Sequence, residues 1–334
     1  MSDLIRTVIS TTFFFAAIRT STPILLAALG GLIADLAGSL NVALEGLMLS
    51  GALAGVIVSA NAPWWVGVLA SLAVGGALGA LMALFHLRLG ADVVLVGFAV
   101  NLMASGGTVF VLSQATGGDK GSSVSLASKA IPSLTIPGLS TLPGVGHTLD
   151  GMFSGHSYLT WVAIGLVFAI WYFLYRTPTG LRLRAVGEYA PAAEAAGVSP
   201  ARLRAAALVV SGCLAGLGGA QLAMYNYVGF TRDMTAGRGF IALGAVLLGA
   251  RHPYGTALAA LLFGAFEALA ASLPAIYTTL PAELVHSIPF VATIIALIVY
   301  ARRAQSRGRR SLQRAAARHE EARAAAPTVL PGDP

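Results

Sequence analysis

The chain has 334 residues, of which 56% are hydrophobic and only 10% charged, and its mean hydropathy is +0.78. Soluble domains carry about 25% charged residues, so this composition excludes an ordinary soluble protein and indicates a polytopic membrane protein. The net charge of +7 does not point to nucleic acid, because Lys and Arg gather in short loops and near the C-terminal end, the positive-inside pattern. The single cysteine, Cys213, excludes an internal disulfide and a CxxC metal site.

A series of apolar segments follows along the chain and predicts an all-α fold. The first is long enough to hold a broken or doubled element at 19–23, and the seventh is too short to cross about 30 Å of hydrocarbon. We therefore expect one bundle of about eight to ten transmembrane helices. The segments are roughly 7–34, 42–60, 64–87, 93–112, 158–175, 203–225, 240–250, 255–273 and 284–300.

The positions of the arginines predict an orientation. Arginines flank the loop at 176–204, follow the last apolar segment and close the third at Arg88. If the segments alternate in direction, these sites share one side, which is the cytoplasm by the positive-inside rule. We expect a multi-pass protein of the cell (inner) membrane, with one transmembrane domain over 1–304 and a cytoplasmic C-terminus.

Two regions outside the apolar segments need separate interpretation. With the arginines on the cytoplasmic side, the loop at 116–157 is expected to be extracytoplasmic. It is rich in Gly, Ser and Pro, and this composition fits either an ordered cover or a flexible loop. The basic tail at 305–334 is predicted to be cytoplasmic and disordered at its end, with lipid headgroups as its expected contact.

The chain contains a faint internal repeat. Residues 45–53 and 238–246 follow the same pattern: a charged residue, a glycine, four residues that differ, Gly-Ala and an apolar residue. A proline-aromatic pair and a Gly/Ala-rich helix follow each copy, and Gly76 in one corresponds to Gly264 in the other. Such repeats are common in transporters, where the substrate route lies between the halves. Chance similarity in a Gly/Ala-rich chain is the alternative.

A polar stretch between the first two apolar segments contains the first site candidates. Asn41 and Glu45 lie four residues apart, so on a helix they share one face. A carboxylate inside a membrane is costly unless it faces protein, water or free backbone N–H groups. We therefore interpret this stretch as the wall of a pathway, with helix–helix hydrogen bonding as the ordinary alternative.

The loop at 176–204 has the composition of a short helix. Pro191 can begin a helix and Gly197 can end it in a left-handed conformation. A rigid cytoplasmic helix of this kind is what a soluble ATPase needs in order to push on a membrane domain. An ordinary inter-helix loop is the alternative.

The sequence resembles a known family, the permease subunits of binding-protein-dependent ABC importers for branched-chain amino acids, simple sugars and nucleosides. It is most similar to the nucleoside branch, although the turn Asp35-Leu36-Ala37-Gly38 departs from that pattern. The resemblance runs from about Thr22 to Val299. The matching residues are Thr22-Pro23, Ala28 to Gly31, Asn41 to Met48, Val93 to Asn101, Leu183 to Glu188, Ala192-Ala193, Ala196-Gly197, Ser211-Gly212, Leu214 to Gly216, Gly218 to Ala220, Gly239 to Leu243, Pro253 and Gly255.

The resemblance implies function, partners and sites. The chain would be the permease of an importer for a small polar solute, a nucleoside or a simple sugar. Its partners would be a cytoplasmic ABC ATPase, a second identical or sister permease and an extracytoplasmic substrate-binding protein. Asn101 and Glu45 rank first for contact with the solute because both lie in matched stretches. The predicted pathway residues are Asn41, Glu45, Met48, Phe98 and Asn101, and the predicted ATPase-coupling residues are Gly187, Glu188, Ala192, Ala193, Ala196 and Gly197.

The residues themselves bear on catalysis and on competing functions. The chain has no GxxxxGK[ST] motif, so we expect it to bind no ATP by a P-loop. No Ser/His/Asp constellation is visible from the spacing, so we expect no enzyme, and we expect no cofactor to be bound by this chain. Its six histidines show no metal-site spacing. One alternative is an ion-coupled transporter that uses intramembrane carboxylates, and another is a passive channel. The carboxylates concerned are Asp35, Glu45, Asp92 and Glu267.

Overall fold

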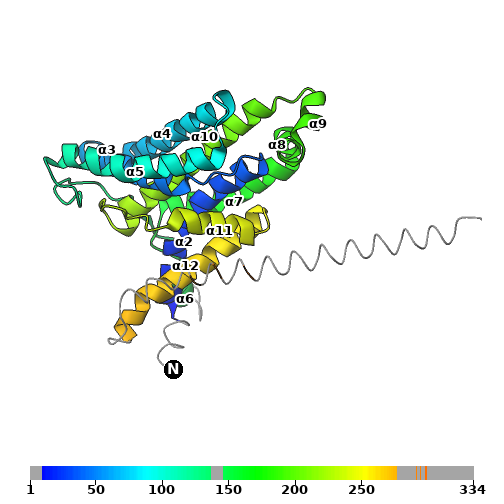
Figure 1. The fold of residues 1–334 in the computed structure, drawn as a ribbon. Coiled ribbons are helices and arrows are strands. Elements are labelled where there is room, and N and C mark those ends of the chain that lie inside the picture. Colours follow the sequence, from blue (N-terminus) through cyan, green and yellow to red (C-terminus); the bar gives the residue numbers. More distant parts are fainter. Residues whose placement is uncertain (1–9, 137–145, 277–290, 292–293, 295–297, 299–334) are drawn as a thin grey trace, which may run out of the picture. The chain divides into compact units, whose positions relative to one another are not determined.

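The computed structural model describes residues 10–136, 146–276, 291, 294 and 298. The chain divides into two compact units, Met1–Thr293 and Ile294–Pro334, and every element named here lies in the first (Figure 1). The helices are α2 (Thr11–Leu36), α3 (Leu44–Asn61), α4 (Trp64–Ala83), α5 (Val93–Thr116), α6 (Gly146–Phe153), α7 (Tyr158–Arg176), α8 (Pro178–Glu188), α9 (Ala190–Ala195), α10 (Pro200–Gln221), α11 (Arg238–Leu248) and α12 (Pro253–Ile276). The π-helical turns η1 (Leu84–Arg88) and η2 (Leu222–Asn226) extend α4 and α10, and the strands are β1 (Ser133–Leu134) and β2 (His156–Ser157).

The predicted all-α membrane fold is confirmed. Seven described helices are long and apolar enough to cross a membrane: α2, α3, α4 with η1, α5, α7, α10 with η2, and α12. Helix α11 has only 11 residues, as the short seventh apolar segment predicts. The last predicted segment, 284–300, lies outside the described residues apart from 291, 294 and 298.

Several helices begin where the sequence supplies a capping side chain. The Ser10 hydroxyl accepts from the N–H of Phe13 at the start of α2, and the Ser157 hydroxyl caps α7. Asp92 accepts from two N–H groups at the start of α5. These side chains satisfy N–H groups that have no partner within the helix.

Helix α2 is continuous through 19–23, so the long first apolar segment holds no broken or doubled element there. Proline normally breaks a helix because it cannot donate to the carbonyl four residues earlier. Here the carbonyl concerned belongs to Arg19, and it accepts from the side-chain amide of Asn226 at 3.4 Å. A partner from η2 therefore replaces the bond that Pro23 cannot make.

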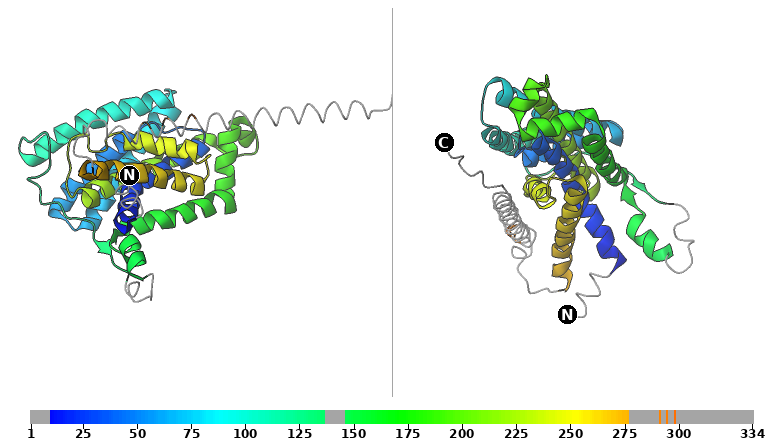
Figure 2. Two further views of the ribbon diagram at one scale, coloured as in Figure 1. Left: turned by 90° about the horizontal axis from the view of Figure 1, so that it is seen from below. Right: turned by 90° about the vertical axis from the view of Figure 1, so that its right-hand side faces the viewer.

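Small residues allow the long helices to touch at their backbones. Gly75 of α4 meets Gly212 of α10 so closely that a Cβ added to either would overlap the carbonyl of the other. On α12, a Cβ added to Gly264 would lie 2.6 Å from the Cα of Ser21 on α2, and Figure 2 shows α12 and α2 side by side. Close contact between small residues drives helix association in membranes.

The contacts support the internal repeat. Helix α4 packs on α10 as α12 packs on α2, and the corresponding glycines Gly76 and Gly264 contact Cys213 and Ser21. Helices α2 and α10 run antiparallel, because Pro23 contacts Gly218 whereas Gly30, later in α2, contacts Ser211, earlier in α10. The unit α2–α3–α4 is therefore related to α10–α11–α12 by an inverted arrangement typical of transporters.

Helices α3 and α11 begin inside the bundle. Asn41, just before α3, is fully buried and donates to the Ser211 hydroxyl, midway along α10, at 2.8 Å. Helix α11 begins against the start of α3, since a Cβ on Gly239 would lie 2.5 Å from the Cα of Glu45. The two helix N-termini therefore meet within the bundle.

The loop predicted at 116–157 is ordered over its described part. Ser123 donates its N–H to the Phe230 carbonyl at 2.8 Å and accepts the Phe230 N–H on its hydroxyl at 2.7 Å. Strands β1 and β2 pair further along the loop. The N–H groups of Gly121 and Ser122 lower the pKa of Asp119 by donating to its carboxylate. This loop is an ordered cover over 229–232, at the end of the bundle opposite α8 and α9.

Candidate functional site

The side chain of Glu45, which belongs to α3, lies against the N-terminus of α11. One carboxylate oxygen accepts from the N–H of Gly237 and the other from the N–H of Gly239, each at 2.7 Å. The first N–H groups of a helix lack internal partners and carry partial positive charge. The side chain of Glu45, at the start of α3, therefore caps the helix that corresponds to α3 in the other half.

A buried ion pair lies beside this cap. Arg238, which takes the place of Glu45 in the repeat, donates through Nε to Glu267 on α12 at 2.8 Å. Its other nitrogens donate to the Met234 carbonyl at 2.9 Å and to the Tyr227 hydroxyl at 3.1 Å. The Arg238 and Glu267 side chains are only 11% and 17% exposed. Because removing one partner would leave an uncompensated buried charge, the pair holds α11 and α12 together.

Asn101 binds α5 to the start of α3. Its carbonyl oxygen accepts from the N–H of Gly46 at 2.8 Å, and its amide donates to the Val42 carbonyl at 3.0 Å. Asn41 similarly accepts from the N–H of Ala43 at 2.9 Å. Two asparagines from different elements thus fix the start of α3 from opposite sides.

The predicted pathway residues fall into two groups. Glu45 and Asn101 are half-buried at the start of α3, and Phe98, one turn before Asn101, is 50% exposed. Asn41 and Met48 are fully buried and lie behind this surface, where Met48 packs against α10. Three of the five predicted residues are therefore at least partly exposed, and the other two are buried.

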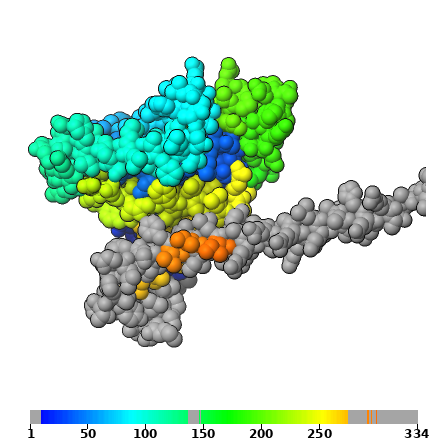
Figure 3. Space-filling view, viewed as in Figure 1, coloured from blue at the N-terminus to red at the C-terminus, as the bar shows by residue number. Residues whose placement is uncertain are grey.

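Helices α5 and α11 lie on the same face of the molecule. Figure 3 shows α5, in cyan to teal, above the yellow α11 and the loop before it. The Ser105 hydroxyl of α5 donates to Asp233 in that loop at 3.2 Å. We call this surface the α5–α11 face. The exposed apolar side chains of α5 include Leu95, Phe98, Leu102 and Met103, and Phe240 of α11 is also exposed.

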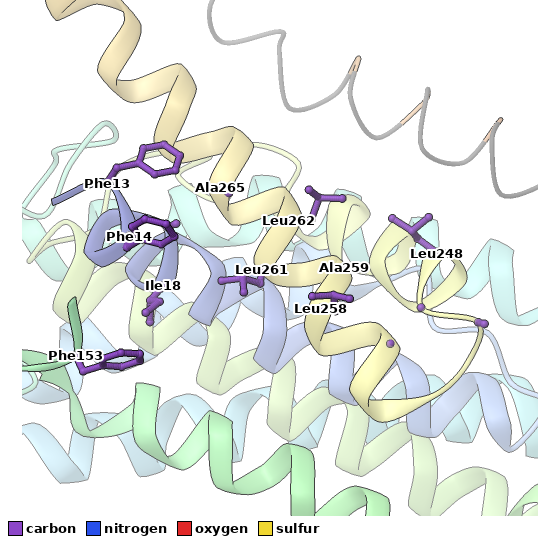
Figure 4. A pocket seen from close by; sticks show the side chains of 14 residues that line it. Phe13, Phe14, Ile18, Phe153, Leu248, Leu258, Ala259, Leu261, Leu262 and Ala265 are labelled. Carbon is purple, nitrogen blue, oxygen red and sulfur yellow. The ribbon is translucent and has the colours of Figure 1, made fainter. Parts of the chain in front are cut away.

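A cavity of about 860 Å³ lies between α2 and α12. Figure 4 shows Phe13, Phe14 and Phe153 at one end and Leu248 at the other. Every residue that lines it is apolar, whereas a site for a polar solute needs a few convergent polar groups. This cavity therefore does not fit the substrate pathway, despite its volume.

The predicted coupling loop contains two helices, α8 and α9, where the sequence suggested one. Gly197 follows α9 with φ of +78°, so the predicted left-handed end of this helix is confirmed. Glu188, Ala192, Ala196 and Gly197 are exposed. Ala193 is only 6% exposed, so a larger side chain there would disturb the fold of this chain itself.

Gly187 differs from the other coupling residues because it contacts α2. A Cβ on Gly187 would overlap the Leu36 carbonyl and lie 3.1 Å from the N–H nitrogen of Gly38. Thr177 and Pro178 begin α8, with the Thr177 hydroxyl accepting from the N–H of Gly180 at 3.1 Å. The end of α8 thus lies directly against the end of α2.

Sequence reasoning missed two features of these sites. It did not foresee the Gly237 and Gly239 N–H groups as partners of Glu45, or the ion pair between Asp35 and Arg251 at 2.7 Å. The first had a signal, because the repeat pairs Glu45 with Arg238 at the start of a corresponding helix. Asp35 and Arg251 lie 216 positions apart in the chain, and no local pattern joins them.

Comparison with known proteins identifies the family. Residues 13–297 match the family model described as branched-chain amino acid transport system / permease component. The chain belongs to this permease family. It is a membrane-spanning permease subunit of an ABC importer, as the sequence predicted, and such a permease works with ATPase and substrate-binding subunits.

Individual relatives cover most of the chain. It is 33% identical to the guanosine ABC transporter permease protein NupQ of Bacillus subtilis, over 91% of this permease and 95% of that protein. It is 32% identical to the nucleoside ABC transporter permease protein NupC of Lactococcus lactis, over 84% and 89%. A putative glucose ABC transporter permease protein of Haloferax volcanii is 34% identical over 76% and 75%. No solved structure matches the chain.

Proposed function

We propose that this permease forms the pathway of an ATP-driven importer of nucleosides. The observation that carries the proposal is the 33% identity over 91% of the chain to a guanosine permease. The relative named as a putative glucose permease covers a smaller share of this chain, 76%. A simple sugar is therefore the second candidate substrate.

The α5–α11 face is our candidate for the pathway wall. A nucleoside needs hydrogen-bond partners for its hydroxyls and base, and an apolar surface for the flat ring. Glu45 and Asn101 supply polar atoms at the start of α3, and Phe98 supplies an exposed ring one turn away. Asn41 and Met48 hold this wall from behind.

A second permease subunit would complete the pathway by covering this face. Exposed apolar side chains on a membrane-spanning helix contact lipid or another helix, and we propose that those of α5 contact the partner subunit. Leu102, which is 76% exposed, provides the test in a Cys213→Ala background. We expect Leu102→Cys to form cross-linked permease dimers and Phe168→Cys, on α7, to form none. Cross-linking through Phe168→Cys alone would move the dimer interface away from α5.

The exposed part of α8 and α9 is our candidate docking site for the ATPase. Glu188, Ala192, Ala196 and Gly197 present small side chains and one carboxylate at this end of the bundle. The end with α8 and α9 then faces the cytoplasm, and the loop cover at 117–136 faces the substrate-binding protein. The permease itself would bind no ATP.

The ion-coupled alternative is not favoured, because each carboxylate that it would use already has a structural partner. Glu45 caps α11, and Asp92 caps α5. Glu267 pairs with Arg238, and Asp35 pairs with Arg251. Protonating any of them would weaken a contact that its ionised form makes within the structure.

Competition uptake tests the substrate. The permease, expressed with its ATPase and binding protein in a host that lacks nucleoside uptake, should accumulate labelled guanosine. Excess unlabelled nucleoside should abolish this uptake, and excess glucose or leucine should not. Inhibition by glucose alone would assign the system to sugars.

A further inference from the structure

The last turn of α2 is held by two arginines from other parts of the chain. Arg251, in the turn between α11 and α12, donates through Nε to the Asp35 carboxylate at 2.7 Å and through Nη2 to the Asp35 main-chain carbonyl at 2.6 Å. Arg204, near the start of α10, donates to the Ala37 carbonyl at 3.3 Å. Cations favour the C-terminus of a helix, where carbonyls lack internal partners. The end of α2 is therefore a junction between α10 and the α11–α12 turn.

The coupling loop meets the same junction. Gly187, at the end of α8, lies against the Leu36 carbonyl and the N–H of Gly38 with no room for a Cβ. Gly38 itself has φ of +79°, a conformation that glycine adopts without strain. A displacement of α8 toward the membrane therefore reaches the backbone of α2 without an intervening side chain.

Both ends of α11 are bonded to residues that flank the connection between α2 and α3. Glu45, after this connection, caps the start of α11 through Gly237 and Gly239. Asp35, before it, binds Arg251 just beyond the end of α11. The connection between them, 37–43, is short and partly buried, with Asn41 fixed to Ser211. Helix α11 is therefore joined to the end of α2 through two carboxylates.

The turn that carries Arg251 is conformationally constrained. Ala250 and Arg251 both have positive φ, +55° and +58°, which is unfavourable for residues with a Cβ. Such conformations persist only where surrounding contacts determine them. The bonds from Arg251 to Asp35 supply such contacts, so the turn follows the end of α2.

We propose that the end of α2 transmits movement of the coupling loop to α11, with Asp35 and Arg251 as positioning residues. This inference rests on the proposed function, in which α11 forms part of the pathway wall. Pressure on Gly187 shifts the end of α2. The Asp35–Arg251 pair and the Glu45 cap then carry α11 with it, changing the wall beside Glu45 and Phe240.

This role predicts loss of coupling rather than loss of folding. The Arg251 side chain is 48% exposed and that of Asp35 15%, so solvent partly screens the ion pair and limits its contribution to stability. A variant that breaks the pair should assemble normally with the ATPase and hydrolyse ATP. It should move fewer solute molecules for each ATP hydrolysed.

The test uses the complete complex of permease, ATPase and binding protein in proteoliposomes. We expect Arg251→Gln and Asp35→Asn each to lower the ratio of guanosine transported to ATP hydrolysed by about fivefold or more. Thermal stability and ATPase co-purification should stay at parental levels. Arg88→Gln is the matched control, because Arg88 is an exposed arginine at the same end of the bundle.

Exchanging the charges at positions 35 and 251 distinguishes a loss of coupling from general damage to the protein. The double variant Asp35→Arg with Arg251→Asp restores an ion pair but not the bond to the main-chain carbonyl, so it should recover part of the lost ratio. Parental ratios in both single variants, or no recovery in the double variant, would overturn the proposal. A parental complex that transports no guanosine would instead refute the proposed substrate. Coupling would then still be measured as stimulation of ATP hydrolysis by the binding protein.

Discussion

The carboxylate of Glu45 lies 2.7 Å from the N–H of Gly239, and this contact joins the two halves of the internal repeat. Each half contributes a helix that begins inside the bundle, and the two beginnings touch. A charged side chain from one half thus satisfies the unpaired N–H groups of the other. The contact explains why a carboxylate is tolerated in an apolar part of the chain.

Replacing Glu45 by leucine should reduce transport more than it reduces the amount of folded protein. The change leaves two N–H groups of α11 without acceptors, at a cost of about 1–3 kcal/mol, and removes a polar atom from the proposed pathway. Uptake per folded molecule, with folded protein measured by size-exclusion chromatography, checks this. Glu45→Gln should retain more uptake, because its amide oxygen still accepts. Equal loss of uptake and of folded protein would assign Glu45 to packing alone.

Tryptophan substitutions in α9 and just after it should separate docking from folding. Ala196 is exposed, so Ala196→Trp should weaken ATPase co-purification and substrate-stimulated ATP hydrolysis while the melting temperature stays unchanged. Ala193 is buried, so Ala193→Trp should lower stability by about 1–3 kcal/mol through overpacking. Ser125→Trp, in the loop at the opposite end, is the control and should leave co-purification intact. Normal coupling in Ala196→Trp would show that α9 is only a connector.

The contact between α4 and α10 should tolerate no side chain at Gly212. Gly212→Val places a branched side chain against the Gly75 carbonyl, and the helices must separate to admit it, at a cost of about 3 kcal/mol or more. Thermal unfolding in detergent should show a large fall in melting temperature. Gly165→Val is the matched control, because a Cβ at Gly165 on α7 meets nothing within 4 Å. Similar melting temperatures for the two variants would contradict the packing described here.

His156 should make the protein less stable in acid. Burial lowers its pKa below the ordinary value of 6.5, and the charge of Arg19 adds to the effect. The imidazole is 1% exposed and stacks on Phe15 with ring centres 4.3 Å apart. Because the unfolded chain takes up this proton more readily than the folded one, the stabilising effect is complete above pH 6.5 and declines below it.

Melting temperatures measured between about pH 7.5 and 5.5 test the contribution of His156. The parental protein should lose more stability over this range than His156→Gln, which cannot titrate. An identical loss in both proteins would show that other groups cause the acid sensitivity.

The sequence was sufficient for the parts of the structure that follow from local pattern. Long apolar runs predicted the membrane helices, and Gly197 ended α9 as predicted. Pro23 lies where the first apolar segment could have been broken. The residue that compensates for it, Asn226, comes from a distant element, so the sequence alone did not reveal it. The Asp35–Arg251 pair was missed for the same reason, since helices must be placed before such partners can be found. Glu45 could be recognised as unusual, but its partners are backbone N–H groups that no residue type reveals.

We propose that this permease moves a nucleoside at the expense of ATP. The most direct test reconstitutes it with its ATPase and binding protein in proteoliposomes and measures accumulation of labelled guanosine. We expect accumulation to require ATP and the binding protein, and to persist when ionophores collapse all ion gradients. Accumulation that needs an ion gradient and continues without ATP would contradict the account.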